Sequence, residues 1–241
     1  MAHRYFTSEI LGDTAFIRGQ QARHIATVLR AKQGDLMVLC DGEGSDYSAR
    51  VTSAEKDSVS FEIIEKTASA SEPGVKVHLF LGYAKGDRMD WAVQKAVELG
   101  AAAITPFFSE KCIVRPAREE EKNLRLARLC QAAAEQSGRG IVPTVHMPLS
   151  FARMLEQAKQ SGPALFCYEG GGISLRQAVE LLPGNTLALV TGAEAGFSPQ
   201  EAQQAENAGH ITVGLGPRIL RCETAPVAAL AAIMALTGNL G

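Results

Sequence analysis

The sequence predicts a two-domain α/β protein, with a small β-barrel domain over residues 1–70 and a larger α/β domain over residues 75–241. In the first 70 residues, apolar side chains recur with the period of two that is typical of strands. From residue 75, apolar strands alternate with amphipathic helices, which indicates a mostly parallel sheet with helices on both faces. The segment 67–74 between them is small and polar and ends in Pro73-Gly74, so we place the boundary there.

Four strands and one helix are predicted in the first domain. The runs 47–51 and 59–63 alternate apolar with polar residues around a polar turn, which indicates a hairpin. Two further strands are expected at Thr14–Arg18 and Asp35–Cys40. A helix over Gln20–Arg30 is expected to bury Ala22, Ile25, Val28 and Leu29 on one stripe.

The second domain is predicted to contain strands at 75–81, 103–108, 164–168, 186–191 and 211–215. Helices are expected from Asp87 to Gly100 and at 118–137, 174–182, 199–208 and 225–236. In open parallel sheets, ligands bind outside the carboxyl ends of the strands, so the loops after these strands are the place to look for function.

Bulk composition indicates an ordinary globular protein. Its 241 residues suffice for two modest domains, and a net charge of −2 does not by itself indicate nucleic-acid binding, although it can conceal a local basic face. The five cysteines show no C-x-x-C spacing, which argues against disulfides and zinc. We find neither an apolar run long enough to span a bilayer nor a signal peptide, and we expect a cytoplasmic protein without a metal.

Three loops that follow predicted strands contain the strongest functional signals. In Thr191–Ser198, Gly192 and Gly196 allow close backbone approach to a ligand, and Ser198 and Glu201 predict a capping box at the start of the next helix. The P-loop lysine and the G-x-G-x-x-G pattern are absent, so this loop alone is equally compatible with simple turn chemistry. The loop 168–172 is also glycine-rich. Together, the three loops can enclose one ligand.

The third loop, 215–226, contains two arginines directly before a predicted helix. Helix capping by Thr224 and a favourable dipole interaction of Glu223 explain part of this pattern. They do not explain Arg218 and Arg221, because positive charge is disfavoured at a helix N-terminus. The two arginines therefore favour a functional role for this loop.

An ordered set of segments resembles the 16S rRNA uracil-N3 methyltransferases of the SPOUT superfamily. Leu215–Ala225 is similar to their C-terminal signature, and Thr191–Ser198 to their G-P-E-G-G-F-S motif, with Ala193 and Ala195 as departures. His24–Arg30 resembles their H-x-x-x-V-L-R segment. Further matches are Gln94–Gly100 and Glu135–Arg139, whereas Lys111-Cys112 replaces an expected arginine-serine pair.

The resemblance implies a PUA-like RNA-binding barrel, a C-terminal domain with a trefoil knot, a homodimer and bound S-adenosylmethionine. Its substrate would be uridine U1498 of the small ribosomal subunit's 16S rRNA. For binding of the cofactor we single out Tyr168, Thr191, Gly192, Gly196, Leu215, Gly216, Ile219, Leu220, Cys222 and Thr224. If Ala195 has to adopt a positive φ, it costs about 1 kcal/mol.

Methylation of N3 of a uridine requires loss of an imide proton. The reaction benefits from a cation beside the uracil ring and from a nearby proton acceptor. Arg221 is our hypothesis for the cation, with Glu223 or Glu194 as the base; the alternative is that Arg221 pairs structurally with Glu223 or with a phosphate. Arginines position RNA through phosphates, although most surface arginines are simply solvated. The candidates for RNA binding are Arg23, His24, Arg30, Arg115, Arg118 and Arg139.

Other functions remain open at this point. A small-molecule nucleotide enzyme would use similar loops but should show a dinucleotide fingerprint, which this sequence lacks. A non-catalytic RNA-binding ribosome-assembly factor would keep the barrel without the cofactor pocket, and a methyltransferase acting on another RNA would keep both.

Overall fold

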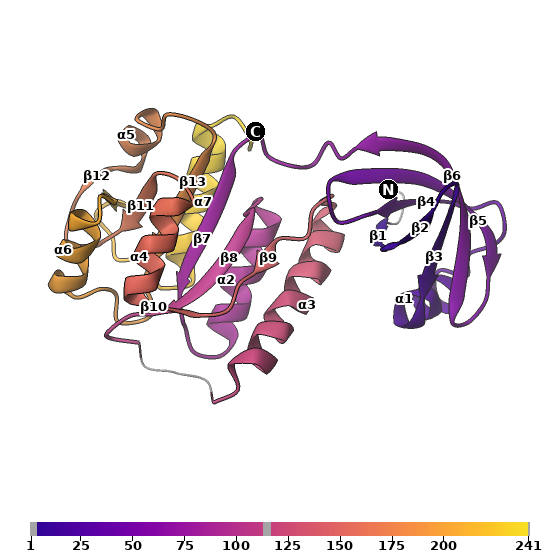
Figure 1. Ribbon diagram of the computed structural model, residues 1–241, viewed down its shortest axis with the longest axis horizontal. Coiled ribbons are helices and arrows are strands. Elements are labelled where there is room, and N and C mark those ends of the chain that lie inside the picture. The colour runs from indigo at the N-terminus through magenta and orange to yellow at the C-terminus, as the bar shows by residue number, and fades with distance from the viewer. Residues whose placement is uncertain (1–3, 113–116, 241) are drawn as a thin grey trace. The chain divides into compact units, whose positions relative to one another are not determined.

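The computed structural model describes residues 4–112 and 117–240 and contains two compact units (Figure 1). The first unit comprises the chain up to residue 72 together with residues 134–142, and the second comprises 73–133 and 143–240. The sequence had placed residues 134–142 in the second domain. They pack with the first because Glu72 accepts hydrogen bonds from the backbone N–H groups of Gly140 and Ile141, at 2.9 and 3.1 Å.

The first unit is built on a six-stranded sheet in the order β1-β4-β5-β6-β3-β2. Its strands are β1 (Arg4–Phe6), β2 (Glu9–Leu11), β3 (Thr14–Arg18), β4 (Leu36–Cys40), β5 (Ser45–Ala54) and β6 (Ser58–Ala68). The predicted hairpin is confirmed, because Ala49 pairs with Ile63 and Val51 with Phe61. The alternating residues lie in the core of this unit, where Val51 and Phe61 are each 1% exposed.

The predicted helix at Gln20–Arg30 is wrong in its second half. A short α-helix, α1 (Gly19–Arg23), continues as a π-helical turn over His24–Val28. The wider π turn shifts the residues that follow out of the α-helical register, so that Val28 is 65% exposed instead of buried. Arg30 then adopts a left-handed φ of 53°.

The second unit is built on a sheet in which all strands run parallel, as the sequence predicted. The order is β10-β8-β7-β13-β11-β14-β12, and β9 pairs with β8. The strands are β7 (Lys76–Gly82), β8 (Ala103–Phe108), β9 (Thr144–Val145), β10 (Leu149–Ser150), β11 (Ala164–Cys167), β12 (Ile173–Ser174), β13 (Thr186–Thr191) and β14 (Ile211–Gly214).

Helices cover both faces of this sheet (Figure 1). They are α2 (Asp87–Glu98), α3 (Glu119–Ser137), α4 (Phe151–Gln160), α5 (Leu175–Glu180), α6 (Pro199–Asn207) and α7 (Thr224–Leu236). The sequence analysis overlooked α4, although Ser150 caps its N-terminus and Met154, Leu155 and Ala158 form its buried stripe. Helix α7 packs on β7 and β13 and contacts α2 and α5.

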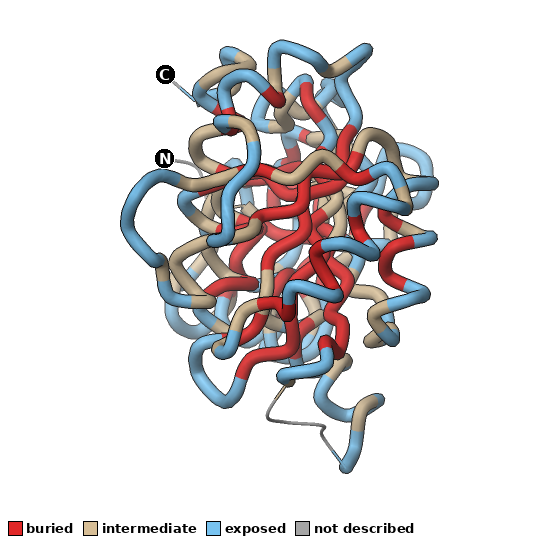
Figure 2. Tube along the Cα trace, turned by 90° about the vertical axis from the view of Figure 1, so that its left-hand side faces the viewer, coloured by how far each residue is buried: buried red, intermediate tan, exposed pale blue. Residues whose placement is uncertain are grey.

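The buried residues follow the strands, while the exposed residues follow the turns and the outer helix faces (Figure 2). In the second unit, one core cluster joins the strands to α4 and α6 through Phe80, Phe107, Phe166 and Phe197. Among the described residues, no helix is long and apolar enough to cross a bilayer.

Candidate functional site

A pocket of about 480 Å³ lies at the carboxyl ends of three adjacent strands, β13, β11 and β14. The three loops that the sequence singled out all contribute to its wall, together with the first turn of α7. Adjacent parallel strands place their carboxyl ends at one edge of a sheet, and this explains why loops far apart in the sequence meet here.

The loop 191–198 is fixed at both of its ends. Thr191 ends β13 and is fully buried. The ring of Phe197 is 2% exposed and lies 4.2 Å from that of Phe166, between ring centroids. Ser198 and Glu201 form the predicted capping box at the start of α6: the Ser198 side chain accepts from the Glu201 N–H, and Glu201 accepts from the Ser198 N–H. The backbone between these anchors forms one side of the pocket.

This loop crosses directly over the end of β7. A Cβ atom on Gly82 would lie 2.3 Å from the backbone nitrogen of Ala193 and 2.6 Å from the carbonyl carbon of Gly192. Side-chain movement cannot relieve such contacts, because both atoms belong to the backbone. Glycine at position 82 therefore sets how closely the loop approaches the sheet.

The departures from the family motif are accommodated without strain. Among the described residues, Arg30 is the one non-glycine residue with a positive φ, so the expected cost at Ala195 does not arise. Ala193 is buried against Gly82. The Lys111 ammonium lies 3.3 Å from the carbonyl oxygen of Phe197, so the substituted side chain contacts the pocket loop.

The loop 215–223 forms the facing wall. Gly216 has a φ of 101° and open space where a side chain would stand, and Ile219 is 88% exposed. The expectation that Thr224 caps α7 is wrong: Glu223 is the N-cap and makes no side-chain capping hydrogen bond, and Thr224 is the first helical residue. Thr224 does not line the pocket.

The structure brings the other nine residues singled out for the cofactor into this one pocket: Tyr168, Thr191, Gly192, Gly196, Leu215, Gly216, Ile219, Leu220 and Cys222. Lining residues that the sequence analysis did not select are Cys167, Glu169, Gly171, Ala193, Ala195, Phe197, Gly214, Pro217, Arg218 and Ala225. Most of them lie on the same three loops, so choosing whole loops would have found them.

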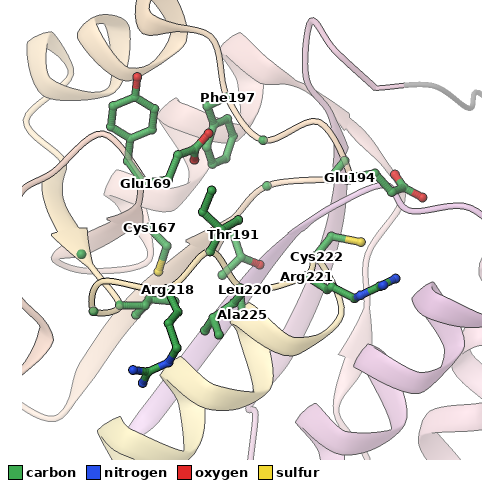
Figure 3. Close-up of a pocket in the computed structure, with 18 of the residues that line it drawn as sticks. Cys167, Glu169, Thr191, Glu194, Phe197, Arg218, Leu220, Arg221, Cys222 and Ala225 are labelled. Atoms are coloured by element: carbon green, nitrogen blue, oxygen red, sulfur yellow. The ribbon is translucent and has the colours of Figure 1, made fainter.

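Charged side chains lie on opposite sides of the pocket. In Figure 3, Glu194, Cys222 and Arg221 point the same way, whereas Glu169 and Phe197 lie on the opposite side. Glu194 and Arg221 line the pocket, and Glu223 lies beside it. The Glu223 carboxylate accepts a hydrogen bond from the backbone N–H of the same residue. This hydrogen bond and the nearby arginines lower the pKa of the Glu223 carboxyl.

Arg221 does not form the structural ion pair considered from the sequence. In the described part of the chain, its exposed side chain makes neither a hydrogen bond nor a salt bridge. The partner of the acidic side chains is instead Arg88, whose Nη1 lies 3.3 Å from Glu194 and whose Nε lies 4.0 Å from Glu223. Arg88 was not among the residues singled out from the sequence, and it is more than 100 residues from both partners along the chain.

The two pocket cysteines are not suited to nucleophilic chemistry. Burial raises the pKa of Cys167 and of Cys222 to about 12, so both thiols stay protonated near neutral pH. Within the described residues, no cluster of histidine, cysteine or acidic side chains is placed to hold a metal. Binding and alignment of ligands, with charged groups at one side, are the chemistry that this pocket can support.

The RNA-binding candidates fall into different settings. Arg23 and His24 are exposed; Arg23 pairs with Asp57, and the His24 ring nitrogen lies 3.1 Å from the Tyr5 hydroxyl. Arg30 is exposed just after the π-helical turn over His24–Val28. These three thus share one region of the first unit.

Two of the remaining candidates lie elsewhere, and the third is outside the described residues. Arg118 is exposed beside α3 and lies 3.3 Å from Glu121. Arg139 is 4% exposed and forms a salt bridge of 2.6 Å with Glu72, so its prediction as an RNA-binding surface residue is wrong. Arg115 belongs to the segment that the structure does not describe.

Comparison with known proteins places this architecture in a defined class. Residues 71–234 match the model of the RNA methyltransferase domain, and residues 17–64 match that of the RNA methyltransferase PUA domain. The first unit is thus PUA-like, and the fold and pocket are those of an RNA methyltransferase.

Full-length relatives define the family more closely. The chain is 36% identical to ribosomal RNA small subunit methyltransferase E of Bacillus subtilis and 34% identical to that of Mesomycoplasma hyopneumoniae. These alignments cover 91% and 93% of this chain, and 89% and 96% of the relatives. The Neisseria gonorrhoeae enzyme, crystallised bound to S-adenosyl methionine, superposes with a TM-score of 0.90 at 34% identity, covering 98% of both chains. The chain belongs to the ribosomal RNA small subunit methyltransferase E family.

Proposed function

We propose that this protein transfers a methyl group from S-adenosylmethionine to N3 of uridine U1498 in the 16S rRNA of the small ribosomal subunit. The observation that carries the proposal is the convergence of three glycine-rich loops on one pocket with a cation and a carboxylate at one side. The S-adenosyl methionine bound to the related Neisseria enzyme supports the same ligand here.

The residues of the pocket fit this cofactor. Thr191 Oγ1 is buried and has no hydrogen-bond partner among the described residues, so it needs a polar ligand atom. Gly216 leaves backbone groups accessible, and Leu220 and Ile219 provide apolar walls for a planar ring. Residues of all three loops would hold the cofactor: Tyr168, Thr191, Gly192, Gly196, Leu215, Gly216, Ile219, Leu220 and Cys222.

When bound, S-adenosylmethionine supplies an electrophilic methyl group on a sulfonium. The protein's part is to align the uracil with that methyl group and to stabilise the charge that develops as N3 loses its proton. Arg221 fits the stabilising role, because it lines the pocket and its side chain makes no hydrogen bond or salt bridge within the described part of the chain. Arg221 lies near enough to Glu223 to help lower the pKa of that carboxyl, and Glu194 lies on the same side of the pocket as Arg221 (Figure 3).

RNA would be positioned by the PUA-like unit and by the second unit. Arg23 and His24 present basic or hydrogen-bonding groups on one exposed helical segment, and Arg30 presents another just after it. Arg118 is exposed in the second unit. Such phosphate contacts give affinity without sequence specificity.

We also propose a trefoil knot at the C-terminus, a homodimer and a cytoplasmic location. The knot is supported by the path of the chain. In the sheet, β11 separates β14 from β13, yet the element that follows β14, helix α7, packs on β13 and β7. The segment 215–223 must therefore cross back over the strand ends, where it faces the loop 191–198. The dimer and the location rest on membership of the family.

The test is incubation of purified protein and radiolabelled S-adenosylmethionine with small ribosomal subunits that lack the modification, followed by nucleoside analysis. We expect label in N3-methyluridine at U1498. Free 16S rRNA in a parallel reaction shows whether the assembled subunit is required. Cofactor binding without label in either RNA would contradict the proposed substrate, and absence of cofactor binding would favour an assembly factor.

Arg221 is tested in the same assay. We expect Arg221→Ala to bind the cofactor normally and to lose about 100-fold or more in the methyl-transfer rate, as when a group that stabilises developing charge is removed. A variant that binds both ligands and methylates at the wild-type rate would contradict the assigned role.

A further inference from the structure

Arg88 contacts acidic side chains on two of the three loops at the pocket, although it belongs to none of these loops. It lies in the first turn of α2. Its Nη1 is 3.3 Å from Glu194 Oε1 on the loop 191–198, and its Nε is 4.0 Å from Glu223 Oε2 on the loop 215–223. One guanidinium thus faces an acidic side chain from each wall. A planar guanidinium can serve two carboxylates at once, which a single ammonium does less well.

Glu194 is held in one orientation by this contact and by the backbone. Its Oε1 accepts a hydrogen bond of 2.7 Å from the N–H of Lys85 in addition to the contact with Arg88. Its side chain is only 13% exposed. Both donors act on the same oxygen, so the direction of the other oxygen is determined.

The second oxygen, Glu194 Oε2, is buried and has no hydrogen-bond partner in the described structure. A buried carboxylate oxygen without a donor is unfavourable, so this atom is expected to gain a donor when a ligand is bound. Glu194 lines the pocket, and its side chain points the same way as that of Arg221 (Figure 3). The imide N–H of a uracil is a donor of the required kind.

Glu223 is less suited to receive that proton. It does not line the pocket, its side chain is 20% exposed, and Oε2, the oxygen nearest Arg88, already accepts from the Cys222 thiol at 3.2 Å. Its contact with Arg88 is also the longer of the two. Of the two carboxylates, Glu194 alone combines a place in the pocket wall with an unsatisfied oxygen.

We infer that Glu194 is the group that takes the N3 proton and that Arg88 is the positioning residue that aims it. The inference rests on the proposed function. In the step, the N3–H proton passes to Glu194 Oε2, the N3 electron pair forms the new bond to the methyl carbon, and the pair of the broken carbon–sulfur bond stays on sulfur. Arg88 does not line the pocket and acts through Oε1 of Glu194.

The test compares two single variants and the double variant with the wild type. The rate of methyl transfer is measured under single-turnover conditions, and the affinity for the cofactor is measured separately. We expect Glu194→Gln, which keeps shape but is a poor proton acceptor, to slow transfer by about 100-fold or more. Arg88→Ala should slow it by about 10-fold through loss of alignment. The double variant should be no slower than Glu194→Gln alone, because Arg88 has no target without the carboxylate. Affinity for the cofactor should stay near the wild-type value.

Arg125→Ala is the matched control. It removes the ion pair between Arg125 on α3 and Asp90 on α2. Neither residue lines the pocket, so the rate should stay unchanged. The inference is overturned by wild-type rates in either single variant. It is also overturned if the two effects multiply in the double variant, or if Arg88→Ala weakens cofactor binding without slowing transfer. Wild-type protein that transfers no methyl group to RNA would instead refute the proposed function.

Discussion

Replacing Gly82 with alanine tests whether the contact between β7 and the loop 191–198 shapes the cofactor pocket. The new Cβ would stand 2.3 Å from Ala193 N, whereas ordinary contacts begin at 3.4 Å, so strand and loop must separate by about 1 Å. Overpacking of this kind costs about 1–3 kcal/mol of folding free energy. For a chain of this size, each kcal/mol lowers the melting temperature by about 2–4 °C.

The same displacement should weaken cofactor binding. The loop carries Thr191, Gly192 and Gly196 into the pocket wall, so a shift of this size moves all of their backbone groups together. We expect the affinity for S-adenosylmethionine to fall by about 10-fold or more, which corresponds to at least ~1.4 kcal/mol. Isothermal titration calorimetry measures the affinity, and thermal unfolding measures the stability.

Gly184→Ala is the control for this experiment. Among the described residues, no atom beyond its own and its two chain neighbours' lies within 4 Å of the position its Cβ would take. Its backbone is not left-handed, so affinity and melting temperature should hardly change. If Gly82→Ala binds the cofactor as tightly as the wild type and unfolds at the same temperature, the proposed contact between strand and loop does not shape the pocket.

Three further predictions concern stability and reactivity. Arg139→Met should lower the free energy of unfolding by about 3 kcal/mol, measured in urea, because it leaves the carboxylate of Glu72 without its buried partner; weaker RNA binding at unchanged stability would contradict the structural role. Burial lowers the pKa of His78 from 6.5 to about 4, so the unfolded state binds more protons between these values. The free energy of unfolding should therefore fall, by about 3 kcal/mol at most, as the pH drops from about 6.5 to about 4. A His78→Gln variant should show a flatter pH dependence, and an equally steep one would assign the effect to another group. The pKa of the native Cys222 thiol is about 12, so little thiolate is present at pH 8. We expect this thiol to react with a disulfide reagent at least about 10-fold more slowly in the native protein than in the unfolded chain, as measured by mass spectrometry. Equal rates would show that the thiol is not protected.

Much of the secondary structure and the location of the site were readable from the sequence. The strands Ala103–Phe108 and Thr186–Thr191 and the capping box of Ser198 and Glu201 occur as predicted. Each depends on a pattern within a few residues, either the period of apolar side chains or the spacing of a cap. The three glycine-rich loops were identified for the same reason, because they directly follow recognisable strands.

Tertiary structure alone decided which side chains face one another. Arg88 meets Glu194, and Arg139 is buried on Glu72, through backbone paths that bring distant segments together. The need for glycine at position 82 also arises from a loop about 110 residues further on. Such contacts depend on packing between elements, and no local period or spacing encodes them. Sequence patterns therefore determined the elements and the loops of the site, while the packing of those elements determined its charges and its shape.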